Sequence, residues 1–301
     1  MRRSLRSPSR FPWRHACVRV ASGALAALVA TVVAGPVAAS PTLDRIKESA
    51  AVSFAYRDGA PPFSFKAPDG KVRGYSVDLC ARVAASLQKE LGLAALKIDW
   101  VAVDAATRLD AIATGKADVL CGTTTITLAR MQTVDFSLPI FVDGGSVLVR
   151  AKAKIQEVAD LKGKRVALIA GTTTEQALTR ALSAAGAAAT LVPVRTGAEG
   201  VALVLQGKAD AYAGDRVVLA NLKLHAPDPS QLELIGDDFS YEPYALALRR
   251  DDPDFRLAVN RALAQLYRSG EIDPIFQRWL APLGRPGPLL HAMYYLNALP
   301  E

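Results

Sequence analysis

A repeated tetrapeptide constrains the fold of this chain more than any other feature of its sequence. Gly-Lys-Ala-Asp occurs at residues 115–118 and again at residues 207–210, each time after an apolar helical pattern and before a short apolar strand pattern. The same shift pairs Gly122 with Gly214 and Thr123 with Asp215. Because a repeated structural unit repeats its sequence pattern at a fixed spacing, we interpret the chain as two similar α/β lobes.

The order of strand and helix patterns indicates parallel sheets covered by helices. Residues 51–56 are apolar at every second position, as in a strand, and residues 75–91 at every fourth, as in a helix. Further strands are expected at 96–103 and 119–121 and around Val166, Leu191, Ala211 and Leu232, with a short helix at 106–114 and helices between the later strands. This alternation is typical of an α/β protein.

We expect the chain to pass between the lobes twice, through strands at residues 146–150 and 244–249, and two passages form a hinge. A long helix starting near Asp252 and the helices after it would return to the first lobe, and the Pro- and Gly-rich stretch from Pro282 on would wrap the surface. The predicted fold class is α/β, two Rossmann-like lobes joined by a two-strand hinge. Lobe I would comprise residues 40–145 and 243–301, and lobe II residues 146–242.

Residues 1–39 predict a signal peptide. They carry six arginines and no acid, and an uncharged run over residues 20–34 precedes Val37-Ala38-Ala39, small residues of the kind that signal peptidase recognises. A membrane anchor is the alternative, but the run is shorter than the ~20 residues that a spanning helix needs. Cleavage after Ala39 would place the protein in the periplasm. The remainder has 30 basic and 29 acidic residues, so its composition predicts no nucleic-acid partner.

Two cysteines, Cys80 and Cys121, remain after the leader in a chain expected to enter an oxidising compartment. A disulfide between them would close a loop of about 40 residues. The alternative is a pair of buried thiols on a helix and a strand, and the sequence leaves both open.

The sequence offers little support for catalysis. The two histidines after the leader, His225 and His291, do not lie near cysteines or acids at a metal-ligand spacing. A phosphate-binding loop ending in lysine and a serine nucleophile elbow are also missing. We therefore expect no catalytic residue, no metal and no cofactor.

Polar residues instead gather where the predicted strands end, which is where open α/β sheets bind ligands. They are Arg57, Arg108, Thr123 to Thr125, Arg130, Thr172 to Thr174 and Asp215. This set predicts a ligand site between the lobes.

Short motifs occur in a fixed order along nearly the whole chain after the leader. They are Tyr56-Arg57-Asp58, Pro62-Phe63-Ser64, Gly74-Tyr75-Ser76-Val77-Asp78, Cys121-Gly122-Thr123-Thr124-Thr125 with Arg130, Phe136-Ser137, Pro139-Ile140-Phe141, Leu161-Lys162-Gly163-Lys164, Gly171-Thr172-Thr173 and the stretch from Arg249 to Pro253. In this order they resemble the polar amino-acid family, family 3, of periplasmic solute-binding proteins, and most of all its glutamate/aspartate-binding members. The resemblance implies the type 2 periplasmic-binding-protein fold, a non-catalytic receptor and an ABC permease of the inner membrane as partner. We also expect a monomer.

The resemblance implies how the amino-acid group would be held. The planar guanidinium of Arg130 would bind the α-carboxylate, and hydroxyls and backbone N–H groups at Thr125 and Thr173 would share its oxygens. Asp215, with Thr123, would bind the ammonium group.

Arg57 and Arg108 would recognise the ligand's side chain. In a closed cleft a neutral ligand would leave both guanidiniums unpaired, at a cost on the order of several kcal/mol, whereas a side-chain carboxylate would pair with them. The alternative is that Arg57 pairs with Asp58 and that Arg108 is a general feature of the family. Phe63, on a turn beside Arg57, would cover the ligand's methylene groups.

Two differences from the glutamate/aspartate-binding relatives fall at the side-chain end of the site. A histidine of those relatives aligns with residues 196–198, which are Thr-Gly-Ala here, and a serine is replaced by Ala105. The choice among glutamate, aspartate and another acidic or amide ligand is therefore open. The alternative function is a periplasmic dehydratase of the cyclohexadienyl or prephenate type on the same fold, with Asp215 as the obvious acid in the cleft.

Overall fold

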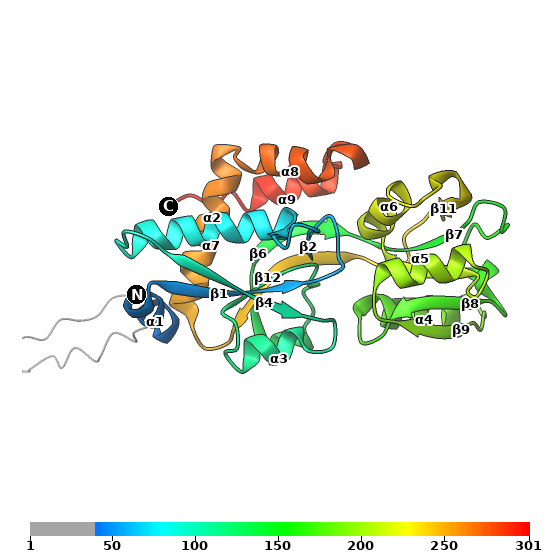
Figure 1. The fold of residues 1–301 in the computed structure, drawn as a ribbon, viewed down its shortest axis with the longest axis horizontal. Helices are drawn as coiled ribbons and strands as arrows, with labels where there is room; N and C mark the ends of the chain where they lie inside the picture. Colours follow the sequence, from blue (N-terminus) through cyan, green and yellow to red (C-terminus); the bar gives the residue numbers. More distant parts are fainter. Residues whose placement is uncertain (1–39) are drawn as a thin grey trace, which may run out of the picture. The chain divides into compact units, whose positions relative to one another are not determined.

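The computed structural model describes residues 40–301, which form two five-stranded sheets with helices on their faces (Figure 1). The predicted signal peptide, residues 1–39, lies outside the described residues. The first sheet has the order β4-β1-β5-β12-β6 and contains β1 (Ala51–Arg57), β4 (Lys97–Val103), β5 (Val119–Cys121), β6 (Val134–Asp143) and β12 (Glu242–Arg249). The second has the order β11-β7-β10-β8-β9 and contains β7 (Gly145–Arg150), β8 (Arg165–Ile169), β9 (Thr190–Val194), β10 (Ala211–Asp215) and β11 (Leu232–Leu234).

Each sheet has one strand, next to an edge strand, that is parallel to both of its neighbours. In the first sheet this strand is β1, between β4 and β5, and in the second it is β8, between β9 and β10. β12 and β6 add antiparallel strands to the first sheet, and β7 and β11 to the second. The predicted α/β class with two lobes is confirmed, while the residue limits of the lobes stay a prediction.

Helices cover both faces of each sheet. Those packed with the first sheet are α1 (Pro41–Ser49), α2 (Tyr75–Glu90), α3 (Arg108–Ala113), α7 (Pro253–Ser269), α8 (Ile272–Leu280) and α9 (Pro288–Leu296), and those packed with the second are α4 (Thr173–Ala184), α5 (Gly197–Leu205) and α6 (Arg216–Leu224). The largest apolar core joins the first sheet to α2, α7, α8 and α9, and α3 covers its other face. Within residues 40–301, none of the helices combines the length and the apolar character needed to cross a bilayer.

The repeated tetrapeptide has the same structure in both lobes. Its glycine has a left-handed backbone, with φ of +73° at Gly115 and +69° at Gly207, a region that favours glycine. Its aspartate fastens the next strand to β1 or β8: the backbone N–H of Ser53 donates to the Asp118 carboxylate at 2.8 Å, and that of Arg165 donates to the Asp210 carboxylate, also at 2.8 Å. The repeat therefore sets the register of the strand that leads to the ligand end of each sheet.

Three expectations about the chain path need correction. β7 and β12 each lie within one sheet, so the connections between lobes are the residues around Gly144, between β6 and β7, and those between β11 and β12. β6, ten residues long, was not predicted. The segment after Pro282 does more than wrap the surface: Gly287 and Pro288 start the helix α9, which buries Leu290, Met293 and Tyr294 in the core.

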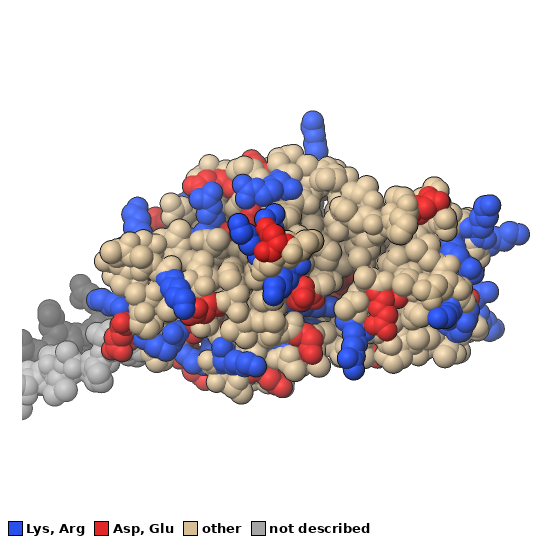
Figure 2. Space-filling model, in the orientation of Figure 1, with Lys and Arg blue, Asp and Glu red and all other residues tan. Residues whose placement is uncertain are grey.

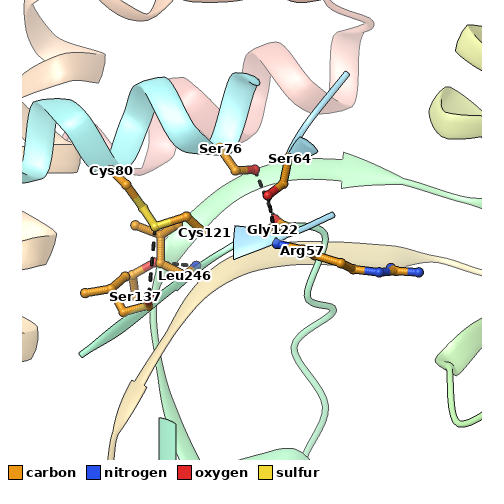
Figure 3. The surroundings of a disulfide bond; sticks show 9 residues. Arg57, Ser64, Ser76, Cys80, Cys121, Gly122, Ser137 and Leu246 are labelled. Carbon is orange, nitrogen blue, oxygen red and sulfur yellow. Dashed lines mark hydrogen bonds between the residues drawn. A yellow bond between two sulfur atoms is a disulfide. The ribbon is translucent and has the colours of Figure 1, made fainter. Parts of the chain in front are cut away.

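Cys80 of α2 and Cys121 of β5 are joined by a disulfide (Figure 3). Next to it, the Ser76 hydroxyl donates a hydrogen bond to the Gly122 carbonyl at 3.0 Å. α2 is thus fastened at two points to the end of β5, just before the threonines at residues 123–125. Charged side chains of both signs are interspersed on the visible surface (Figure 2), in line with the balanced composition of residues 40–301.

We predict that breaking the disulfide destabilises the protein by about 2 to 4 kcal/mol, because the cross-link restricts the unfolded chain over the 41 residues between the cysteines. Urea unfolding of the wild type and of a Cys80→Ala/Cys121→Ala variant, each with and without reductant, measures this difference. The double variant is the control, since reductant should not affect it. Two titratable thiols in the exported, unreduced wild type would contradict the prediction.

Candidate ligand-binding cleft

A cleft lies where the carboxyl ends of β1, β5 and β10 meet the first turn of α4. It is lined by Arg57, Gly59, Ala60, Arg108, Thr123, Arg130, Ile169, Thr172, Thr173, Thr174, Tyr212, Ala213, Gly214, Asp215 and Val218. Six of the predicted site residues are therefore brought together here: Arg57, Arg108, Thr123, Arg130, Thr173 and Asp215. Thr125 lies beside them, with its hydroxyl 3.1 Å from that of Thr173.

Arg57 extends from the end of β1 beyond the disulfide region (Figure 3). Its Nη1 donates to the Thr123 hydroxyl at 3.1 Å, and its backbone N–H donates to the Ser64 hydroxyl at 3.0 Å. Asp58, the alternative partner, instead accepts a hydrogen bond from the backbone of Lys66. The guanidinium of Arg57 is thus held in the cleft by a neutral partner.

Arg108 is the first residue of α3 and is 3% exposed. Its Nε has no hydrogen-bond partner among the residues that the structure describes. Burial, together with the charges of Arg130 and Arg57, lowers the pKa of Arg108 to about 9. The group is still cationic at neutral pH, so this shift reflects a buried cation in need of an anion.

Arg130 begins a 3₁₀ turn, Arg130–Gln132, and its Nη1 donates to the Thr125 carbonyl at 2.7 Å. Burial lowers the pKa of Arg130, while the charges of Glu242 and Asp215 oppose that effect. All ion pairs within 4 Å in residues 40–301 involve other arginines and lysines. The three cleft arginines therefore lack a direct acidic partner in that part of the chain.

Glu242, at the start of β12, was not predicted as a site residue. Its carboxylate accepts hydrogen bonds from the hydroxyls of Thr125 at 2.6 Å, Thr173 at 2.8 Å and Ser240 at 2.7 Å. The two threonine hydroxyls expected on the ligand are thus donated to Glu242, and they link the two lobes through it. The backbone N–H groups at the start of α4 can still bind a ligand, because the first N–H groups of a helix lack intrahelical partners. No local sequence pattern indicates that Glu242 belongs to the site, since it is a single acid beside a proline.

Two carboxyl groups lie close together here: Asp215, a partly buried residue that lines the cleft, and the buried Asp143 outside its lining. Asp215 accepts a hydrogen bond from the Thr174 hydroxyl at 3.0 Å, and burial raises the pKa of its carboxyl. Asp143, at the end of β6, accepts N–H bonds from Gly144 at 2.8 Å and from Val217 at 3.2 Å. Burial, together with the nearby charge of Asp215, raises the pKa of Asp143 to about 8.

The prediction that Phe63 covers the ligand is wrong. Its side chain is completely buried, with ring centroids 4.9 Å from Phe141, 5.5 Å from Tyr244 and 5.8 Å from Tyr75. It belongs to the aromatic core of lobe I and does not line the cleft. Its position next to a turn near Arg57 did not reveal to which side the ring points.

Comparison with known proteins adds independent information. A family model for bacterial extracellular solute-binding proteins, family 3, matches residues 52–282. The L-glutamate/L-aspartate-binding protein of Pseudomonas aeruginosa is 33% identical over 267 residues, which cover 87% of this chain and 88% of that protein. The glutamate/aspartate import solute-binding protein of Salmonella typhimurium is 30% identical over 245 residues, 81% of each chain.

A solved structure is also similar to this chain, in sequence and in fold. It is that of an ancestral amino acid-binding protein, AncCDT-1, described as a precursor of cyclohexadienyl dehydratase. It has a TM-score of 0.69 and 32% sequence identity, and the match covers 79% of this chain and 99% of that one.

The buried acid at the hinge predicts how stability varies with pH. Since the pKa of Asp143 is raised by folding, the folded state holds a proton that the unfolded state loses, and its contribution to stability falls as pH rises from about 4 to about 8. One such group contributes at most ~1.4 kcal/mol per pH unit. We expect Asp143→Asn, which keeps an acceptor for the two N–H groups, to flatten this decline in urea unfolding measured between pH 5 and 8.

Asp210→Asn serves as the control for this measurement. The pKa of Asp210 is lowered, mainly by its hydrogen bond with Arg165. Its contribution to the free energy of unfolding therefore changes only at more acidic pH. Equal slopes for the wild type and Asp143→Asn would contradict the prediction.

Proposed function

The chain belongs to family 3 of the bacterial extracellular solute-binding proteins, and from this we propose that it is a periplasmic receptor that binds glutamate or aspartate and delivers it to an ABC importer. The observation that carries the choice of ligand is the charge of the cleft. Three guanidiniums and one carboxyl group, that of Asp215, line it. A dicarboxylic amino acid has two carboxylates and one ammonium group, so its charges complement this set.

The amino-acid group of the ligand would lie between the lobes. Arg130 would bind the α-carboxylate, together with backbone N–H groups at the start of α4, and Asp215 would bind the ammonium with help from Thr123. Since Arg130 and Thr123 come from lobe I, and α4 and Asp215 from lobe II, one ligand would bridge both. Binding would therefore favour the closed arrangement of the lobes, which the permease would then recognise.

The side-chain carboxylate would pair with Arg57 and Arg108. The guanidinium of Arg108, buried and incompletely hydrogen-bonded, would gain most from this contact. A neutral ligand would leave this charge without compensation, which supports an acidic ligand over an apolar one.

A second candidate is a dehydratase, favoured by the similarity to the precursor of cyclohexadienyl dehydratase. Burial raises the pKa of Asp215, so its carboxyl group could hold a proton and donate it to a leaving hydroxyl. Incubation with prephenate and detection of phenylpyruvate would test for turnover. Turnover that is lost in Asp215→Asn would favour the enzyme over the receptor.

Isothermal titration calorimetry on protein freed of ligand tests the proposed receptor. We expect one site for glutamate or aspartate with a dissociation constant near or below micromolar, and weaker binding of glutamine, asparagine and leucine. Arg130→Ala should weaken all ligands by about 30-fold or more, corresponding to about 2 kcal/mol or more, because it strands the α-carboxylate that they share. Arg108→Gln should instead weaken acidic ligands selectively.

Arg261→Ala is a matched control for these variants, since Arg261 lies exposed on α7 and pairs with Glu90. It should bind like the wild type. Unchanged glutamate and aspartate affinities in Arg108→Gln would contradict the role of Arg108, and absence of binding by the wild type would contradict the receptor proposal.

The raised pKa of Asp215 predicts that ligand binding is coupled to proton release. The ammonium group pairs with the ionised carboxylate, so below its raised pKa the group must lose a proton on binding, and affinity should increase as pH rises. Calorimetry at one pH in buffers of different ionisation enthalpy counts the protons released. Asp215→Asn should abolish the effect, and a binding enthalpy independent of buffer in the wild type would contradict it.

A further inference from the structure

The side-chain end of the proposed glutamate or aspartate site has fewer polar groups than the resemblance implies. Residues 196–198 offer no histidine and residue 105 offers no serine hydroxyl. The Thr196 hydroxyl caps the start of α5, where it accepts a hydrogen bond from the backbone N–H of Glu199 at 3.2 Å. A further group is therefore needed if a side-chain carboxylate is to be fully hydrogen-bonded there.

Tyr212 of β10 has its hydroxyl near residues 196–198. Its side chain lines the cleft although the residue is 2% exposed. Its ring lies against Gly200, where an added Cβ would be 2.4 Å from the ring, and its oxygen lies near Gly197, where an added Cβ would be 3.3 Å away. The two glycines of α5 thus make room for the ring and place the phenol beside residues 196–198.

The hydroxyl of Tyr212 differs from those of four other buried tyrosines. Tyr75 and Tyr294 bond to each other, Tyr244 donates to Asp143 and Tyr267 donates to the Pro139 carbonyl. Among residues 40–301 no such bond is found for Tyr212, which lines the cleft, or for the buried Tyr56, which does not line it. The Tyr212 hydroxyl is therefore free to bond to a ligand, as a largely buried phenol normally bonds to some partner.

The phenol of Tyr212 is a neutral donor at physiological pH. Burial raises its pKa well above the usual value, and the positive charge of Arg57 opposes this only in part. The hydroxyl therefore keeps its proton while lying in the field of the cleft arginine.

We propose that the Tyr212 hydroxyl donates a hydrogen bond to the side-chain carboxylate of the bound ligand, beside Arg57 and Arg108, and so determines specificity. This inference rests on the proposed function, since it needs an acidic amino acid in the cleft. A hydrogen bond to a charged group is among the stronger ones, so its loss should weaken binding about tenfold or more.

Tyr212→Phe tests the proposal because it removes the hydroxyl and keeps the ring. We would measure the affinities of L-glutamate, L-aspartate and L-norvaline, which has no side-chain carboxylate, by calorimetry and by ligand-induced thermal shift. The expected result is a loss of about tenfold or more for at least one of the two acids, with norvaline unaffected and the melting temperature of the unliganded protein retained. Tyr267→Phe is the matched control, because it removes a buried hydroxyl of lobe I outside the cleft.

Two results would overturn the proposal while leaving the proposed function intact. One is an affinity of Tyr212→Phe for both acids within twofold of the wild type. The other is an equal loss for norvaline and the acids, which would indicate a merely structural role. If the wild type bound none of these amino acids, both this role and the proposed function would fall.

Discussion

Mutual repulsion among three guanidiniums is the constraint around which the cleft is built. Arg57, Arg108 and Arg130 line one space, and Arg108 is the buried one of the three. Burial and the charges of Arg130 and Arg57 disfavour the cationic form of Arg108. In isolation such side chains would move apart or reach for water. Here the elements around them are fixed: Asp118 fastens β5 to β1, and the disulfide fastens α2 to β5. Lobe I thus maintains a repulsion that a ligand with two carboxylates would relieve, and a rigid site gains affinity in this way.

Asp215 in the cleft and Asp143 beside it would link the ligand's charge to the connection between the lobes. Asp215 directly precedes α6, and the carboxylate of Asp143, one residue before Gly144, accepts an N–H bond from the first turn of that helix. The charge of Asp215 contributes to the raised pKa of Asp143. A cation placed beside Asp215 would favour ionisation of that group. It would thereby alter the electrostatics of the segment that connects the lobes, without any need for a long-range relay.

The sequence predicted what repeats and what is charged, and it missed what depends on packing. The repeat at residues 115–118 and 207–210 indicated two lobes, and the guanidiniums at strand ends indicated the cleft, because strand ends are placed by local pattern. Glu242 became a site residue only through contacts with Thr125 and Thr173, which are 117 and 69 residues away. The prediction for Phe63 failed for a related reason, because a residue beside a turn can face either the core or the cleft.

Replacing a histidine by a phenol at the side-chain end would change more than the shape of the site. A histidine titrates near neutral pH, so its grip on a carboxylate would vary with the acidity of the periplasm, which exchanges with the surroundings. The Tyr212 hydroxyl keeps its proton across that range, and the arginines keep their charge. Recognition of the side chain would then be insensitive to pH, and the pH dependence of binding would come from Asp215 at the other end of the ligand. Specificity and proton coupling would thus reside in separate groups of one cleft.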